Sequence, residues 1–414
     1  MSLAGIRAAV RPLYHNGLRK PAIRLAASAL KRLPFSSAVA GPPKGAAPTT
    51  REWVSAYNAG RMRTKASYRT KSSYQALSPA HSIVRETPRS VESVLHPDLS
   101  QPRHEFAETF VAVIPQGRAV KFNGAIITPD DFLLEDVSQE YDSERYTRGR
   151  HTVLSSVRLP KKTHFQGSMA VLMTLGQEFF GHWMMDMLPR IDLLAQAGHA
   201  PETIDWFYLG PCLHPYERET LASFGIPLSK VISERDYPHV QADRLIVPSY
   251  VGGCFAASAQ TCAFLRRRFL DAAPPVAFGW PRRLYISRAS TSHRRVINEA
   301  AILDVLRPLG FEVVEPQALS LPEQAGLFRS ASVVVTPLGS ALANFVYCRP
   351  GTKIIEFFNP RCVQSCTWTV CHQQELEYYY LLASGVNPQA HVISEDITLD
   401  PDKLLQTLAL AGIC

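Results

Sequence analysis

Residues 336–344, Thr-Pro-Leu-Gly-Ser-Ala-Leu-Ala-Asn, have the composition of an anion-binding turn. They follow an apolar β-branched run at 333–335, and the small residues from Ser340 to Tyr347 predict a short helix. Unpaired backbone N–H groups at a helix start, together with the positive end of the helix dipole, attract anions. A buried strand, a glycine turn and a helix start in this order therefore predict a diphosphate site.

Other residues suited to a nucleotide occur in the same region. Arg288, Arg294 and Arg295 offer bidentate donors for phosphate oxygens. Glu356, in the apolar run 353–358, can accept hydrogen bonds from the two hydroxyls of a ribose. The competing explanation is a solvated basic loop in which one arginine pairs with Glu356. The sequence has neither G-x-G-x-x-G nor G-x4-G-K-[ST], which argues against a dinucleotide enzyme and a P-loop nucleotidase.

A second set of reactive side chains lies between residues 179 and 190. If residues 182–197 are helical, His182, Asp186 and Arg190 follow at i, i+4 and i+8 and share one face. An imidazole beside a carboxylate can act as a general base with an orienting partner. The competing explanation is a surface ion pair between Asp186 and Arg190, with His182 at the helix start. Pro189 predicts a kink or the start of a second helix.

The spacing Cys362-x3-Cys366-x4-Cys371-His372 raises the question of a metal. It lacks the C-x2-C pairs of structural zinc sites, so we predict no metal site and free thiols in a reducing compartment.

Alternating strands and helices surround these residues and predict an α/β fold with parallel strands. The Pro274-Pro275 pair, with Gly279 and Pro281 nearby, is the strongest candidate domain boundary. Strands are predicted at 110–114, 117–122, 125–128, 170–175, 205–209, 244–248, 283–287, 311–315, 332–335 and 353–358. Helices are predicted at 216–224, 260–272, 299–309, 320–329 and 399–410, with Asn298 capping the third of these.

The N-terminal region carries the basic character of the chain. Residues 1–90 hold sixteen Lys and Arg against two acids, a net of +14, so the remainder nets −6 within a total of +8. We expect the folded body to begin near residue 104. For residues 1–50, an amphipathic segment on an anionic membrane surface, a disordered tail and a mitochondrial presequence are the alternatives. Nucleic-acid binding is not expected, because aromatic platforms are missing from the basic run.

Seven segments, in order, resemble glycosyltransferase family 61, the group related to protein O-linked N-acetylglucosaminyltransferases and plant xylan transferases. The resemblance covers roughly residues 105–385. It rests on Gly181-His-Trp-x2-Asp-x2-Pro-Arg190, Tyr285-Ile-Ser-Arg288, Arg294-Arg-Val-Ile-Asn298-Glu299, Gly310-Phe-Glu-Val-Val314, Leu319-Ser-Leu-Pro-Glu-Gln324, Gly339-Ser-Ala-Leu-Ala-Asn344 and Pro350-Gly-Thr-Lys-Ile-Ile-Glu356.

The resemblance implies a GT-B-like fold, with two facing Rossmann-like domains and a basic, partly disordered N-terminal extension. We expect an extension at 1–100, an acceptor-side domain at 101–274, a nucleotide-sugar-binding domain at 275–390 and a C-terminal helix region at 391–414 that packs back on the body.

The same resemblance assigns expected roles to individual residues. His182 or Asp186 is the general base, and Arg190 supports them. Glu356 contacts the ribose. The donor diphosphate is expected to contact Arg288, Arg294, Asn298, Gly339, Ser340 and Asn344.

The implied activity is an inverting transfer of a sugar from a nucleotide sugar to a glycan or lipid-linked acceptor in surface polysaccharide synthesis, without a metal. The resemblance is to bacterial enzymes at the cytoplasmic face, with peripheral attachment to the membrane left open. One departure is Thr336-Pro-Leu-Gly339, where the family usually has Gly-Pro-His-Gly. Leu338 cannot donate to a phosphate, so a non-catalytic relative that binds a glycan or a partner is the alternative.

Overall fold

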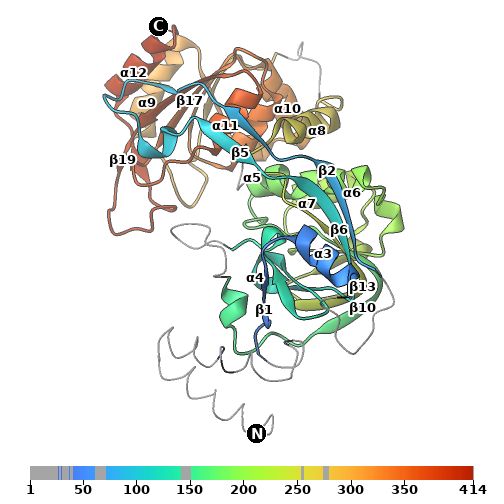
Figure 1. Cartoon of the computed structure of the whole chain (residues 1–414). Coiled ribbons are helices and arrows are strands. Elements are labelled where there is room, and N and C mark those ends of the chain that lie inside the picture. The colour runs from blue at the N-terminus through green and yellow to red at the C-terminus, as the bar shows by residue number, and fades with distance from the viewer. Residues whose placement is uncertain are drawn as a thin grey trace. The chain divides into compact units, whose positions relative to one another are not determined.

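The computed structural model describes residues 41–60, 71–140, 151–252, 256–273 and 279–413, together with residues 27, 29 and 37. The chain forms two compact units, each with α and β elements (Figure 1). The first unit comprises Met1–Pro79, Glu108–Glu178 and Arg190–Tyr250, and the second comprises Ala80–Ala107, Phe179–Pro189 and Val251–Cys414. These units are interleaved along the chain, whereas the sequence predicted consecutive segments.

The first unit is built on a ten-stranded mixed sheet with the order β1-β9-β8-β7-β13-β10-β11-β12. Strand β13 pairs in parallel with β10, and its other edge pairs antiparallel with β7 and then with β6, which also pairs with β2. The strands are β1 (Gly45–Ala47), β2 (Ser73–Ser78), β6 (Thr109–Pro115), β7 (Arg118–Val120), β8 (Ala125–Ile127), β9 (Phe132–Leu134), β10 (Thr163–Val171), β11 (Trp206–Leu209), β12 (Val231–Ser233) and β13 (His239–Pro248). Its helices are α3 (Thr50–Asn58), α4 (Lys121–Gly124), α6 (Leu188–Gln196) and α7 (Pro215–Ser223).

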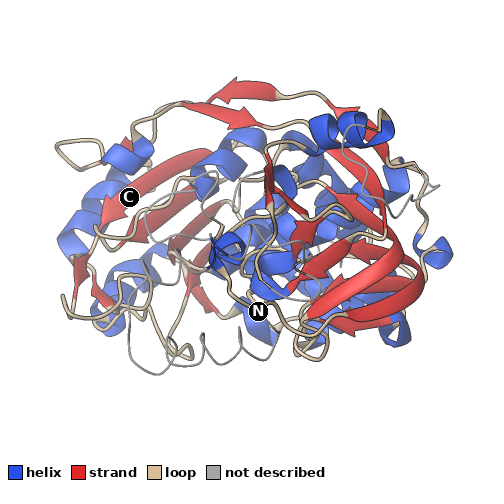
Figure 2. Ribbon diagram, turned by 60° about the horizontal axis from the view of Figure 1, so that its bottom comes forward, coloured by secondary structure: helices blue, strands red, loops and turns tan. Residues whose placement is uncertain are grey.

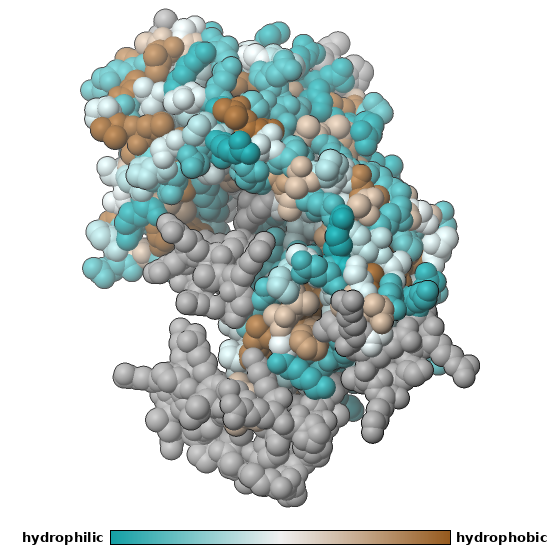
Figure 3. All heavy atoms as spheres, viewed as in Figure 1, coloured by the Kyte–Doolittle hydropathy of each residue, from teal (hydrophilic) through white to brown (hydrophobic). Residues whose placement is uncertain are grey.

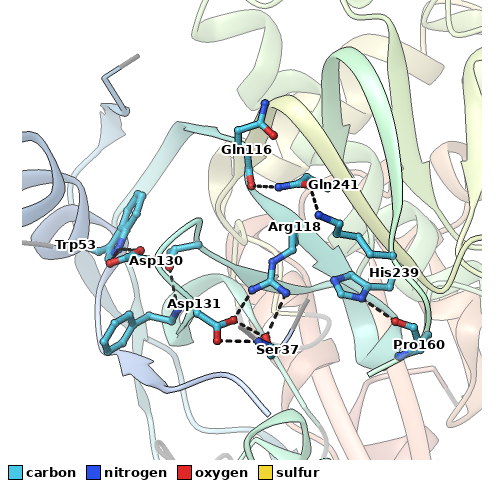
Figure 4. Close-up of polar contacts among 12 residues, drawn as sticks. Ser37, Trp53, Gln116, Arg118, Asp130, Asp131, Pro160, His239 and Gln241 are labelled. Atoms are coloured by element: carbon cyan, nitrogen blue, oxygen red, sulfur yellow. Dashed lines mark hydrogen bonds and ion pairs between the residues drawn. The ribbon is translucent and has the colours of Figure 1, made fainter. Parts of the chain in front are cut away.

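Ordered structure begins well before residue 104, where the sequence placed the start of the folded body. Strand β1 pairs with β9, and α3 carries Trp53, which donates to Asp130 at 3.1 Å (Figure 4). Ser37 lies against a buried ion pair between Arg118 and Asp131, and its backbone N–H donates to Asp131 at 2.9 Å. A buried charge pair needs such extra hydrogen bonds to offset its lost hydration, so these early residues belong to the core.

The second unit is built on a six-stranded sheet with the order β15-β14-β16-β17-β18-β4, in which every pairing is parallel. Its strands are β14 (Arg283–Ile286), β15 (Glu312–Val314), β16 (Val333–Pro337), β17 (Lys353–Phe358), β18 (Glu377–Leu382) and β4 (Arg89–Ser90). Smaller pairs are formed by β3 (His81–Val84) with β5 (Arg103–Phe106) and by β19 (Ser384–Gly385) with β20 (Ile397–Thr398). Parallel strands need crossover helices, and the chain supplies them between successive strands.

Helices cover the sheet of the second unit, as the blue ribbons beside red strands show in Figure 2. Val335, Ile355 and Tyr379 point to one face, where they form a core with residues of α9 and α12. The intervening strand residues point to the opposite face, which η10, α10 and α11 help to cover. The helical elements are α5 (Phe180–His182), η4 (Trp183–Met187), α8 (Ala259–Phe269), α9 (Glu299–Leu306), α10 (Leu321–Ser330), η10 (Ser340–Tyr347), α11 (Cys366–Gln373) and α12 (Pro401–Leu410).

Residues 80–107 belong to the second unit, where they are tied to α11. Arg85 is buried, donates to Thr369 at 2.9 Å, and places its guanidinium 3.7 Å from the ring centroid of Trp368. Ser90 of β4 donates to the carbonyl of Tyr380 at 2.7 Å. The sixth strand of this sheet therefore comes from a part of the chain assigned to the basic extension.

The predicted strands and helices from residue 110 onward are present, but β10 begins and ends before the predicted strand at 170–175, and β13 begins before the predicted strand at 244–248. Gly310 ends the helix after α9 with a φ of 76°, and Ser320 and Glu323 form the predicted capping box. The basic segments before residue 27 and the Pro274-Pro275 pair lie outside the described residues. No helix among those described is long and apolar enough to cross a bilayer, and the coloured surface in Figure 3 is mainly hydrophilic.

Candidate active site

The reversal of strand order in the second unit marks a natural ligand position. From β14 the chain goes outward to β15, then returns past β14 to β16. In such sheets, ligands bind outside the carboxyl ends of the strands where the order reverses. Arg288 follows β14 and Gly339 follows β16, so the two segments singled out from the sequence meet at this position.

Gly339 lets the Arg288 guanidinium approach the turn. Its φ of −176° is ordinary extended backbone, so conformational freedom does not explain the glycine. A Cβ at this position would instead collide with Nη1 of Arg288. Any larger residue would push the guanidinium away from the start of η10.

Arg288 is held by main-chain carbonyls. Its Nε donates to the carbonyl of Arg294 at 3.2 Å, and its Nη2 donates to that of His293 at 3.1 Å. Burial, and then the charge of Arg294, lower the pKa of Arg288 to about 10. The guanidinium remains charged at neutral pH, but its environment disfavours that charge.

Arg294 is a second arginine of the same loop, and its charge acts on Arg288. Its backbone is left-handed, with a φ of 55°, and its buried Nε has no hydrogen-bond partner within the described residues. Burial lowers the pKa of Arg294 as well. Over the described ranges, neither Arg288 nor Arg294 has a carboxylate within ion-pair distance. The nearby carboxylate of Asp396 pairs with Arg295 instead. Two half-buried positive charges without an acid favour the binding of an anion.

The start of η10 adds backbone donors to these charges. Gly339 occupies the N-cap position without a side-chain cap, and Ser340 is the first helical residue. The first N–H groups of a helix have no partner within the helix. Asn344 lies deeper: it is fully buried and its Nδ2 donates to Gln324 at 2.8 Å, which ties η10 to α10. Asn344 therefore lies beneath the turn rather than on its surface.

Asn298 occupies the predicted cap position of α9, but its side chain makes no cap hydrogen bond. Its Nδ2 donates to the carbonyl of Leu399 at 2.6 Å, and its Oδ1 accepts from the Leu399 N–H at 3.0 Å. Both ends of the amide are thus used by a C-terminal segment. This geometry corrects the predicted cap and argues against a direct contact between Asn298 and the diphosphate.

Glu356 is fully buried, which argues against its predicted ribose contact. Its carboxyl accepts from Tyr378 at 2.8 Å and lies 3.3 Å from the Thr367 hydroxyl. Burial raises the pKa of Glu356 to about 8, although both hydrogen bonds favour the charged form. The side chain points to the face of the sheet that α11 covers, so it joins the core under that helix.

His182 and Asp186 form a close pair in the second unit. Nδ1 of His182 lies 2.6 Å from Oδ2 of Asp186, and both side chains are largely buried. The pairing places the imidazole proton on Nδ1 and leaves Nε2 as the basic nitrogen. Helix α5, which carries His182, packs against η10. The structure thus brings the predicted base and the predicted diphosphate turn into one unit.

A π-helical turn, η4, carries Asp186 and runs up to the segment that contains Pro189. Proline has no N–H to donate, and its ring would clash with the carbonyl of Met185 in a regular α-helix. The wider turn bonds Leu188 N–H to the carbonyl of Trp183 and accommodates the proline. Single π turns are frequent at functional sites.

Arg190 is buried at the start of the part of α6 that belongs to the first unit. It belongs to the first unit, where its guanidinium donates to the carbonyls of Met173 and Pro248 and lies 4.9 Å from the ring centroid of Tyr250. These contacts fix the guanidinium of Arg190, and its supporting role stays a prediction.

The cysteine spacing at 362–371 gives no ligand set in the structure. No cluster of three or more His, Cys, Asp or Glu side chains is placed to hold a metal among the described residues. Cys362, Cys366 and Cys371 are free thiols, and burial raises the pKa of Cys366 to about 12. A protonated thiol is a poor metal ligand. Independence from metals stays a prediction.

Several residues of the site were not identified from the sequence. His293 lies close enough to Arg294 and Arg288 for their charges to lower its pKa further, after the larger effect of burial. Asp396 binds Arg295 from a segment about one hundred residues away. Neither residue carries a local signal, because only tertiary structure brings it to the loop. The π turn did have a signal, since Pro189 interrupts an otherwise helical pattern.

Comparison with known proteins agrees with this geometry. No curated protein matches the chain. Residues 180–355 match the family described as Glycosyltransferase 61, a stretch that contains His182, Asp186, both arginines and the turn before η10. Membership of this family indicates a glycosyltransferase, which transfers a sugar from a donor to an acceptor. Residues 180–355 of the chain are therefore assigned to glycosyltransferase family 61.

Proposed function

We propose that the protein is an inverting glycosyltransferase that uses a nucleotide-sugar donor and a glycan or lipid-linked glycan acceptor. The observation that carries this proposal is Arg288 beside Gly339, where the strand order of the sheet reverses, with Arg294 near enough for its charge to lower the pKa of Arg288. Arg288 and Arg294 are half-buried charges without an acidic partner in the described ranges. A diphosphate supplies the negative charge and the acceptor oxygens that these guanidiniums lack.

In the proposed reaction, Nε2 of His182 takes the proton from an acceptor hydroxyl. The resulting oxygen attacks the anomeric carbon from the side opposite the diphosphate. The bond from that carbon to the phosphate oxygen then breaks, and its electrons leave with the nucleoside diphosphate. Asp186 holds the imidazole in the required tautomer and stabilises its positive form, as an orienting carboxylate does in related dyads.

The developing charge on the leaving diphosphate is stabilised by groups already in place. Arg288 needs little rearrangement, because main-chain carbonyls hold its guanidinium, and the N–H groups at the start of η10 are fixed by the backbone. Arg294 adds a second positive charge from the same loop. We propose that they perform this function without a bound metal. A GT-B arrangement, a role in surface polysaccharide synthesis and peripheral attachment to an anionic membrane at the cytoplasmic face belong to the same proposal.

The experiment is the release of nucleoside diphosphate from a panel of nucleotide sugars. Arg288→Ala removes charged hydrogen bonds, each contributing about 1.5–3 kcal/mol, so we expect binding of the diphosphate to fall by at least about tenfold. Arg267→Ala on α8 is the matched control, since it removes an exposed arginine in the same unit. Full activity of Arg288→Ala would contradict the site assignment.

A non-catalytic relative remains a second candidate because of Leu338. This residue is 7% exposed, and its N–H donates to the carbonyl of Phe357 at 3.2 Å. Its side chain gives the turn no polar group where family members have histidine. The two candidates are separated by thermal unfolding with UDP, GDP, ADP and CDP: stabilisation by one of them supports the transferase, and no response to any supports the binding protein.

A further inference from the structure

The basic loop between β14 and α9 is fixed by a distant C-terminal segment, residues 395–399. Ile397 N–H donates to the carbonyl of Arg295 at 2.9 Å, and Ile297 N–H donates to the carbonyl of Ile397 at 2.9 Å. The loop therefore gains a parallel bridge, between Val296 and Ile397, outside the main sheet. Asn298 completes the contact through its two hydrogen bonds to Leu399.

Asp396 makes the charged part of this contact. Its Oδ1 accepts from the backbone N–H of Arg295 at 2.8 Å, while its Oδ2 accepts from Nη2 at 2.7 Å and from Nε at 3.1 Å. The carboxylate thus binds both the main chain and the side chain of one residue. Burial opposes its ionisation, but the hydrogen bonds and charge of Arg295 outweigh it and lower the pKa of Asp396.

The neighbouring residue Glu395 anchors the same segment on its other side. Its carboxylate accepts from Asn359 Nδ2 at 2.5 Å, from Arg361, and from the Asn387 N–H at 2.9 Å. Asn359 directly follows β17. Residues 395 and 396 therefore link the loop after β14 to the loop after β17.

The contact between Asp396 and Arg295 lies next to Arg294, whose backbone conformation requires support. Arg294 immediately precedes Arg295 and has a left-handed backbone, which an arginine adopts only when its surroundings impose it. The carbonyls of His293 and Arg294 also orient Arg288. Fixing the backbone at Arg295 therefore supports the carbonyls that orient the Arg288 guanidinium and the left-handed main chain that carries the Arg294 side chain.

We propose that Asp396 is a positioning residue of the diphosphate site, holding Arg288 and Arg294 in their anion-binding arrangement through the backbone of Arg295. The proposal rests on the function given above and deepens it. It places a determinant of donor affinity beyond residue 355, where the family match ends. Residues 395–399 lie in the chain between β19 and α12, which are both labelled in Figure 1.

The test measures binding by calorimetry of whichever of UDP, GDP, ADP and CDP stabilises the wild-type protein most, with inorganic pyrophosphate as a probe independent of the base. For Asp396→Ala we expect the dissociation constant of both probes to rise by about tenfold. Asp396→Asn keeps one acceptor for the Arg295 N–H and should recover part of that loss. Glu377→Gln removes a carboxylate that pairs with Arg89 in the same unit and serves as the matched control, with unchanged binding.

The outcomes separate this inference from the proposed function. If Asp396→Ala binds within about twofold of wild type while Arg288→Ala does not bind, the positioning role is wrong and the site stands. If Arg288→Ala also binds like wild type, the diphosphate site itself is wrong. If Asp396→Ala fails to fold, Asp396→Asn decides: a raised dissociation constant at an unchanged melting temperature supports the proposal, and wild-type binding overturns it.

Discussion

The stability of the Glu356→Gln variant, compared with wild type at the same pH, should increase as the pH rises. Burial raises the pKa of Glu356 from its usual 4.5 to about 8. Between these values the folded protein keeps a proton that the unfolded chain has lost. The stability associated with the protonated carboxyl is therefore fully present below pH 4.5, falls as the pH rises, and levels off above about pH 8.

The size of the effect follows from the shift in pKa. At 1.36 kcal/mol per pH unit, a shift of about 3.5 units corresponds to about 5 kcal/mol in total, of which about 4 kcal/mol falls between pH 5 and pH 9. Glutamine has nearly the same shape, accepts from Tyr378, can hydrogen-bond Thr367, and does not ionise. For a domain of this size, 1 kcal/mol shifts the melting temperature by about 2–4 °C, so the advantage of the variant should grow by about 10 °C over this range.

The assay is thermal unfolding of both proteins at pH 5, 7 and 9. Glu377→Gln on β18 is the control, because that carboxylate is far more exposed and pairs with Arg89. We expect no comparable trend for it. If the melting temperatures of Glu356→Gln and wild type stay parallel within about 2 °C across this range, the buried-acid reasoning is refuted.

Two further predictions concern the site. His182→Ala should lower the turnover rate by about 10²–10⁴-fold with nucleoside diphosphate affinity unchanged, and Asp186→Asn should lower it less; single-turnover kinetics with equilibrium binding checks both. Nucleoside diphosphate should bind more tightly as the pH falls from 8 to 6. Its negative charge offsets the arginines that help lower the pKa of His293, so the pKa of His293 rises on binding and a proton is taken up. Calorimetry across this range should show the trend in wild type and lose it in His293→Gln.

The elements of the second unit were largely predictable because their signals are local. The β-branched run of β16 and the capping box at Ser320 need no tertiary information. The turn before η10 was predicted from residue type and spacing, and Arg288 lies beside its Gly339 in the structure. Strand β18 was missed although Tyr378, Tyr379 and Tyr380 have high strand propensity.

What could not be predicted depends on contacts between distant residues. The burial of Glu356 follows from α11, a helix without a strong sequence pattern. Asn298 has the residue type of a helix cap, but Leu399 offers it two backbone partners instead. In each case a long-range partner outweighs a local preference of modest strength.

The contribution of β4 to the sheet of the second unit has a consequence for folding during synthesis. Ser90 and its partner Tyr380 are 290 residues apart. At a synthesis rate of about 5–20 residues per second, β4 leaves the ribosome about 15–60 s before β18 is available to pair with it. Contacts between residues so far apart in the sequence slow folding, and a strand that has not yet paired can pair with other chains. With only two residues, β4 offers little edge for such pairing.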